Sequence, residues 1–328
     1  MNIIRCQNKR EVYEEINILR GISIVLVVLG HSFIGENNNI LIRYVIKVIY
    51  SFHMPIFFFV SGFLAIKIFN LDNIIEKFKF LKNKFIKLMI PYFLVTLLAI
   101  PIKLVMNSFV KRKIEMSEVI IDMFVFPNKN PVASLWFIYT LFIIFFIAVI
   151  CNKIKVNKMI YISLTCLLIS AFFKVEFMNI YGVFRNLVFF YLGLLIRITY
   201  KLEEINNSKN NIRLFIFTLS LILFINIFFV DNPILIEIVY LFTGVFGIFM
   251  GVFLSRIIYK NINLNKILCK INKYALPIYL FSWFTQNCIG YVGYKILNIR
   301  YSIVIIFTFI AGFMPIIIYK YTIRKINS

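Results

Sequence analysis

The stretch LRGISIVLVVLGHSF, residues 19–33, is apolar enough to cross a membrane, yet it carries an arginine near one end and a histidine near the other. A run of this length and composition is typical of a membrane-spanning helix. Lipid rejects charged side chains, and an arginine at the centre of a span costs about 3 kcal/mol on insertion scales. We therefore expect Arg20 and His31 to face a polar or wet interior rather than acyl chains.

The composition of the whole chain favours the same class of protein. Hydrophobic residues make up 61% of the 328 positions and aromatic residues 18%, and the mean hydropathy is +0.89. These values are typical of a polytopic helical membrane protein and exclude an ordinary soluble globule. The formal charge of +22 does not indicate nucleic-acid binding, because Lys and Arg lie mostly in short connections between apolar stretches.

The apolar stretches divide the chain into ten expected membrane-spanning helices within a single domain, residues 1–328. Their long unbroken runs lack the alternation of barrel strands, so we expect an all-α bundle. Lys and Arg are more frequent in alternate connections, which predicts that both termini are cytoplasmic. The charged start leads into the first apolar run without a small-residue cleavage pattern, so we expect that run to be retained. The expected spans lie near 16–35, 44–67, 85–106, 133–151, 157–173, 181–200, 212–230, 234–258, 274–297 and 301–321.

Arg20 and His31 are eleven residues apart. On an α-helix this spacing is about 1100° of rotation and about 16 Å of rise, so the two side chains share one face. Two interpretations remain open. In the simpler one, Arg20 reaches the cytoplasmic interface and His31 is a hydrogen-bonded residue near the outer end. In the other, they line a polar path through the bilayer.

The second of only two histidines, His53, favours the functional interpretation, since it lies in the outer half of the second expected span, at a depth similar to that of His31. Two imidazoles in one slice of the membrane predict a general base, or a base with an orienting donor. Pro55 is expected to start a helix and so to leave His53 at a break in the span. No metal site is expected because there is no third histidine, and the five scattered cysteines indicate neither a disulfide framework nor zinc.

Four further positions carry weaker signals. Ser61 and Gly62 offer a small surface that favours close helix packing over a serine nucleophile, although a ligand could also approach there. Lys84 and Lys87 are predicted to lie one helical turn apart at the inner end of the third span. Either they anchor that span or they dock the phosphates of a nucleotide-like donor.

Trp136 begins the fourth span at the outer interface, where tryptophan is common. Arg185 is a second cation inside the membrane with no acid near it in the sequence, which suggests a role in binding an anionic substrate.

Five segments together resemble one family. They are Arg20 and His31 with ten residues between them, SFHMPIFFFVSGFL, the basic turn before Ile90-Pro91-Tyr92, LWFIYTLF and INKYALPIYLFSW. With the ten-span layout, the chain resembles the acyltransferase 3 family of membrane-bound O-acetyltransferases that modify bacterial surface sugars. The resemblance implies an acyl-CoA donor in the cytoplasm, usually acetyl-CoA, no bound cofactor, and a location in the bacterial cytoplasmic membrane. The acceptor would be a hydroxyl of a surface saccharide or of its lipid-linked precursor.

The resemblance also implies roles for individual residues. His31 corresponds to the catalytic histidine of the family and Arg20 to its partner arginine, while His53 would orient substrate or share the proton. Lys84 and Lys87 stand where many members have two arginines. The motif at Tyr279 ends in Ser282 where many relatives have histidine, as in a branch similar to the sugar 4-O-acetylases.

Two other functions stay open at this point. A transporter or flippase of a lipid-linked saccharide would use Arg20 and Arg185 to bind a diphosphate. A non-catalytic membrane assembly partner would use its buried polar groups only to hold helices together.

Overall fold

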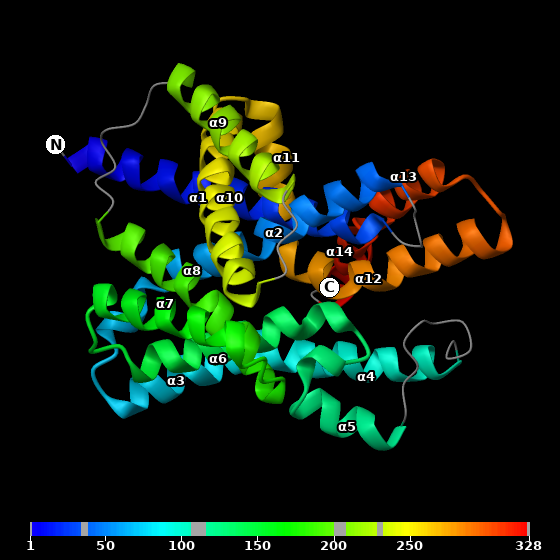
Figure 1. The fold of residues 1–328 in the computed structure, drawn as a ribbon, viewed down its shortest axis with the longest axis horizontal. Helices are drawn as coiled ribbons and strands as arrows, with labels where there is room; N and C mark the ends of the chain where they lie inside the picture. The colour runs from blue at the N-terminus through cyan, green and yellow to red at the C-terminus, as the bar shows by residue number, and fades with distance from the viewer. Residues whose placement is uncertain (1, 34–38, 106–115, 200–207, 228–231, 327–328) are drawn as a thin grey trace. The chain divides into compact units, whose positions relative to one another are not determined.

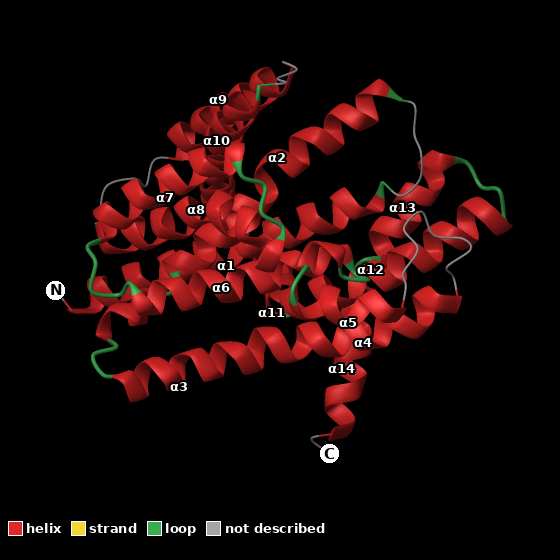
Figure 2. Cartoon of the chain, turned by 60° about the horizontal axis from the view of Figure 1, so that its bottom comes forward, coloured by secondary structure: helices red, strands yellow, loops and turns green. Residues whose placement is uncertain are grey.

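The computed structural model describes residues 2–33, 39–105, 116–199, 208–227 and 232–326, and every regular element within these ranges is helical (Figure 1 and Figure 2). The α-helices are α1 Asn2–Ser32, α2 Ile40–Phe63, α3 Ile74–Lys84, α4 Ile90–Val105, α5 Met116–Phe124, α6 Trp136–Ile150, α7 Val156–Phe172, α8 Ile180–Thr199, α9 Ser208–Ile227, α10 Pro233–Tyr259, α11 Ile262–Lys273, α12 Ala275–Tyr291, α13 Tyr301–Ala311 and α14 Met314–Ile326. Short 3-10 helices are η1 Ile66–Asn70, η3 Pro127–Lys129, η4 Ala133–Leu135 and η5 Phe177–Asn179, and π-helical turns are η2 Phe85–Met89 and η6 Val292–Ile296.

Eight helical stretches in the described part of the chain are long and apolar enough to cross a membrane. They overlap eight of the ten expected segments, and most of them extend beyond the expected bounds. Of the other two, α7 is apolar but has only 17 residues, and the segment near 274–297 is α12 followed by η6 and is less apolar. The expected all-α polytopic membrane fold is confirmed. The eight stretches are Glu14–Ser32, Ile40–Asn70, Ile74–Leu104, Ala133–Ile150, Phe177–Thr199, Asn210–Ile227, Pro233–Tyr259 and Tyr301–Lys320.

The chain forms two compact units. The first unit comprises Met1–Val60, Tyr200–Val230 and Val239–Ser328, and the second comprises Ser61–Thr199 and Asp231–Ile238. The first unit therefore contains α1, most of α2, and the helices from α9 to α14 apart from the start of α10. The second contains α3 to α8 with the last turn of α2 and the first turn of α10.

Helix α1 is held in the first unit by contacts that need small or polar side chains. A Cβ atom at Gly21 would lie 2.6 Å from the carbonyl oxygen of Leu268, so α1 and α11 approach closely only because position 21 is glycine. The side-chain amide of Gln286 on α12 donates to the carbonyl oxygen of Val28 at 2.8 Å. These contacts fix α1 between its neighbours and position the residues that it carries.

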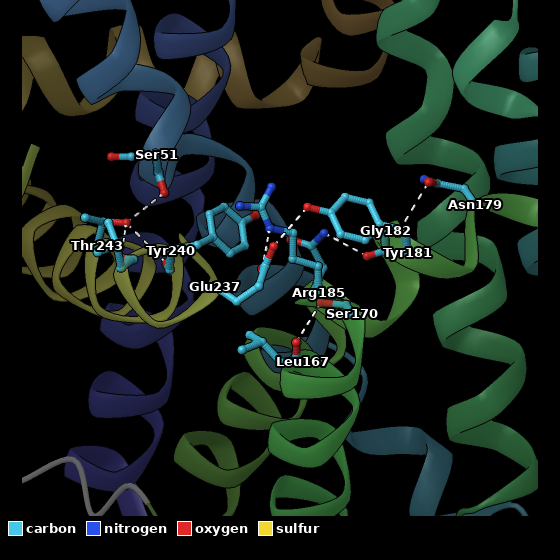
Figure 3. Close-up of polar contacts among 12 residues, drawn as sticks. Ser51, Leu167, Ser170, Asn179, Tyr181, Gly182, Arg185, Glu237, Tyr240 and Thr243 are labelled. Atoms are coloured by element: carbon cyan, nitrogen blue, oxygen red, sulfur yellow. Dashed lines mark hydrogen bonds and ion pairs between the residues drawn. The ribbon is translucent and has the colours of Figure 1, made fainter. Parts of the chain in front are cut away.

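The break expected at His53 is wrong, because α2 continues through Pro55. Proline has no N–H to donate to the carbonyl of Ser51 one turn earlier. The hydroxyl of Thr243 on α10 lies 3.3 Å from that carbonyl oxygen, as the left part of Figure 3 shows, and it also lies 2.8 Å from the carbonyl oxygen of Val239 in its own helix. A neighbouring helix thus brings a shared hydroxyl near the carbonyl that the proline leaves without its N–H, and His53 lies in mid-helix.

The second unit is held together by close packing and by buried amides. A Cβ atom at Gly62 would lie 1.9 Å from the carbonyl oxygen of Phe190, so any side chain there would clash with α8. The geometry supports helix packing as the reason for Gly62. Elsewhere in this unit, Asn130 donates to the hydroxyls of Tyr92 and Thr96 at 3.0 and 2.8 Å, which ties the connection before α6 to α4.

Candidate functional site

The first unit brings its two histidines together around one tyrosine. Tyr50 lies on α2 one turn before His53, and its ring makes an edge-on contact with that imidazole, with 5.0 Å between centroids and 85° between planes. The same ring makes a second T-shaped contact with His31 of α1, with 6.2 Å between centroids and 89° between planes. The hydroxyl oxygen of Tyr50 lies 3.4 Å from Nδ1 of His31. These three side chains are called the histidine cluster below.

The two imidazoles differ in exposure and in hydrogen bonding. His53 is 4% exposed, and its Nδ1 lies 2.8 Å from the carbonyl oxygen of Ile49. A carbonyl can only accept, so we assign the proton to Nδ1, which leaves the lone pair on Nε2. His31 is partly exposed, and its described hydrogen-bond partner is Tyr50. The cluster therefore contains imidazole nitrogens that can take a proton. One of the two rings is buried and the other is partly exposed.

Arg20 lies on the face of α1 that leads to His31. The residues between them on this face, Ile24 and Val27, are 0% and 2% exposed, so the face is directed into the protein. They are apolar, and they separate the arginine from the histidine cluster along the helix.

The charge of Arg20 has no internal counterion in the part of the chain that the structure describes. No described carboxylate forms an ion pair with its guanidinium, which is itself partly exposed. Glu15, one and a half turns earlier on α1, forms an ion pair with Arg256 of α10 at 3.3 Å. A cation within an apolar span normally has a partner, so Arg20 has the character of a site for an anion or for developing negative charge.

Arg185 differs from the sequence expectation. The sequence shows no acid near it, but in the second unit its Nε lies 2.8 Å from Oε2 of Glu237, which is 1% exposed (Figure 3). Tyr181 donates its hydroxyl to Oε1 of the same carboxylate at 2.9 Å. The prediction failed because the two partners are 52 residues apart. Glu237 therefore neutralises the positive charge of Arg185, which was expected to bind an anionic substrate.

The lysines expected one helical turn apart lie in two different helical elements. Lys84 ends α3, while Lys87 lies in the π-helical turn η2, which changes the direction of the residues that follow. The ammonium of Lys84 lies 3.8 Å from the centroid of the Phe145 ring, a cation–π contact within the second unit. Lys87 is exposed. The two cations thus differ in environment, one covering an aromatic ring and one open to the surroundings.

The other predicted residues are distributed between the units. Ser61 and Trp136, which begins α6, are both partly exposed and belong to the second unit with Lys84, Lys87 and Arg185. Tyr279 belongs to the first unit, with Arg20 and both histidines, and is 5% exposed on α12. Ser282, where many relatives have histidine, is buried one turn further on.

Sequence reasoning missed two residues with available signals. Tyr50 precedes His53 by three residues, the spacing at which two side chains meet on one helical face. Glu237 is the one acid within the expected span 234–258. An acidic side chain inside the membrane is expected to pair with a basic one. Among the described residues no group of three or more His, Cys, Asp or Glu side chains could hold a metal ion.

Comparison with known proteins gives one result that covers most of the chain. A family model described as an acyltransferase domain matches residues 13–319, a range that includes the histidine cluster, Arg20 and both compact units. No curated protein and no solved structure matches the chain significantly. On the match over nearly its whole length, and with helices suited to several membrane crossings, this chain belongs to the acyltransferase 3 family and is a multi-pass membrane acyltransferase.

Proposed function

We propose that this protein is an O-acetyltransferase of the bacterial cytoplasmic membrane. It transfers an acetyl group from cytoplasmic acetyl-CoA to a hydroxyl of a cell-surface saccharide or of its lipid-linked precursor. The observation that carries this proposal is the meeting of His31 and His53 around Tyr50, in a chain with only two histidines. Imidazole is the side chain best suited to take and return a proton near neutral pH.

The reaction needs a base for the acceptor and an acid for the leaving group. Nε2 of His31 takes the proton from the acceptor hydroxyl as its oxygen bonds to the thioester carbonyl carbon. The carbon–sulfur bond then breaks, and the imidazolium returns the proton to the departing thiolate of CoA. General acid–base catalysis of this kind contributes a factor of roughly 10²–10⁴. His53 orients the acceptor or shares the proton.

Arg20 stabilises negative charge in this scheme, on the phosphates of the donor or on the oxyanion that forms at the thioester carbonyl. Support comes from its place on the inward face of α1 and from the lack of a described carboxylate that pairs with it. With both termini cytoplasmic, Arg20 lies toward the donor side and His31 toward the acceptor side, about 16 Å further along α1. The donor must therefore reach past Ile24 and Val27.

The remaining residues have supporting roles in the proposal. Lys87, which is exposed, and Lys84 are assigned to the phosphates of the donor. Lysine offers a point charge there rather than the two-pronged contact of arginine. Trp136 and Tyr279 are assigned to the acceptor saccharide. Ser61 is left to helix packing beside Gly62.

The transporter alternative loses one of the two arginines that it proposed for binding a diphosphate. It required Arg185 to bind a diphosphate, but the guanidinium already pairs with the buried carboxylate of Glu237. Displacing that carboxylate would leave a nearly fully buried acid without its cation, at a cost of several kcal/mol.

The test compares O-acetyl groups on surface glycans of cells that carry wild type, His31→Ala, Arg20→Ala or the exposed control Lys153→Ala at matched membrane levels. The proposal predicts that His31→Ala and Arg20→Ala lose O-acetylation while Lys153→Ala keeps it. Full O-acetylation by His31→Ala would reject the proposal. A His31→Ala strain that keeps its acetyl content but stops exporting the glycan would establish the transporter instead.

A further inference from the structure

Tyr50 is the one member of the histidine cluster without a part in the proposed reaction. Its hydroxyl oxygen lies 3.4 Å from Nδ1 of His31, and its ring makes a T-shaped contact with each of the two imidazoles. Gly30 on α1 lets the ring approach the helix that carries His31. A Cβ atom at Gly30 would lie 3.3 Å from the Tyr50 ring, so glycine at the position before His31 lets the ring lie close against α1.

The tautomer of His31 decides whether it can act as a base. A phenol hydroxyl can accept or donate a hydrogen bond. If Tyr50 donated to Nδ1, the proton of neutral His31 would sit on Nε2, and the nitrogen remote from Tyr50 would have no lone pair for the acceptor. If the phenol oxygen accepts from Nδ1–H, the lone pair is on Nε2. Only the second arrangement is compatible with Nε2 as the base.

We propose that Tyr50 is a positioning residue for His31, whose oxygen accepts a hydrogen bond from Nδ1–H and so directs the basic Nε2 toward the acceptor hydroxyl. This inference rests on the proposed function of His31. The distance of 3.4 Å is long for such a bond, as is common before substrate binds.

The bond becomes stronger during the reaction. When Nε2 takes the proton, His31 becomes a cation, and a hydrogen bond from a charged donor is about twice as strong as a neutral one. The tyrosine oxygen therefore stabilises the transition state more than the substrate complex, and it does so without touching substrate. Such an interaction raises kcat and leaves KM nearly unchanged.

The first test is the substitution Tyr50→Phe, which removes one oxygen and keeps the ring. The matched control is Tyr44→Phe on the same helix, where the hydroxyl donates to the carbonyl oxygen of Leu223 instead. Transfer from acetyl-CoA to surface polysaccharide of a deletion strain is measured with purified protein. We expect kcat to fall about 10-fold to 100-fold in Tyr50→Phe with KM for acetyl-CoA within twofold, and Tyr44→Phe to match wild type. Wild-type kcat in Tyr50→Phe, or a fall matched by an equal loss of folded protein, would overturn the proposal.

The second test reads the tautomer directly and does not depend on activity. With two histidines in the chain, a sample labelled with ¹⁵N-histidine shows four ring nitrogens, and His53→Gln assigns the pair that belongs to His31. We expect a protonated Nδ1 and an unprotonated Nε2 in wild type, and a mixture of tautomers in Tyr50→Phe. A proton on Nε2 of His31 in wild type, or an unchanged spectrum in Tyr50→Phe, would overturn the role of Tyr50. Failure of the proposed function would appear separately, as full activity in His31→Ala.

Discussion

The two compact units each contain a polar cluster within apolar helices, and the clusters are built differently. In the second unit, both oxygens of the Glu237 carboxylate are bonded, one to Arg185 and one to Tyr181. In the first unit, the imidazoles of His31 and His53 keep nitrogen capacity that no described bond uses, and no described carboxylate pairs with Arg20. A saturated cluster stabilises a fold, whereas an unsaturated one can bind or react with something else.

The largest effect on stability is expected at the saturated cluster. Glu237→Ala removes the carboxylate that compensates Arg185, and breaking a buried pair from one side costs about 3 kcal/mol, the low end of the range, since a quarter of the Arg185 side chain is exposed. Thermal unfolding in detergent measures the loss. The double variant Arg185→Leu with Glu237→Leu should regain most of it. A Glu237→Ala protein that melts like wild type but transfers no acetyl groups would contradict this prediction. It would show that Glu237 and Arg185 serve the reaction and not the stability of the fold.

A smaller effect is expected where the hydroxyl of Thr243 on α10 lies near the carbonyl that Pro55 leaves without an N–H donor. Thr243→Val removes the hydroxyl that reaches the carbonyl of Ser51, at a cost of about 0.5–1 kcal/mol. In a Pro55→Ala background the backbone N–H of residue 55 is available for that carbonyl, so Thr243→Val should cost less there. Unfolding of the four proteins in a double-mutant cycle measures the coupling. Equal costs in both backgrounds would show that the threonine does not serve the proline.

The smallest effect is expected at an exposed ion pair, which contrasts with the buried one. The hydrogen bond from Lys153 lowers the pKa of Asp72, so any stabilisation is present at neutral pH and is lost as the pH falls through the lowered pKa. Both side chains are exposed and solvent screens their attraction. Asp72→Asn should therefore leave the melting temperature at pH 7 unchanged within error. A clear drop would mean that exposed pairs contribute to stability here as buried pairs do.

The sequence predicted the elements whose signal is local. The apolar runs gave the helical membrane fold, and the spacing of Arg20 and His31 placed both on one face of a helix that the structure confirms as continuous. The pairing of Arg185 with Glu237 was missed because it joins residues of different helices. The break at His53 was predicted wrongly because α2 continues through Pro55, and the hydroxyl that lies near the freed Ser51 carbonyl belongs to Thr243, 192 residues away. Prediction from local sequence patterns does not identify a partner that only tertiary packing brings close.

The π-helical turn η2 illustrates the same limit within one segment. The spacing of Lys84 and Lys87 fits a turn of α-helix. The sequence carries no signal for the extra residue that a π-helical turn accommodates. The contact of Lys84 with the ring of Phe145 on α6 could not be predicted from the sequence either, because it depends on the packing of two helices. The resemblance to the family, which rests on short local motifs, was confirmed over residues 13–319.

The measurement that tests the central claim most directly is the initial rate of transfer from acetyl-CoA by purified His31→Ala, with its melting curve recorded on the same sample. Loss of the proposed base predicts a rate roughly 10²–10⁴-fold below wild type with an unchanged melting temperature. A wild-type rate in the folded His31→Ala protein would contradict the assignment of the unsaturated cluster as the catalytic site.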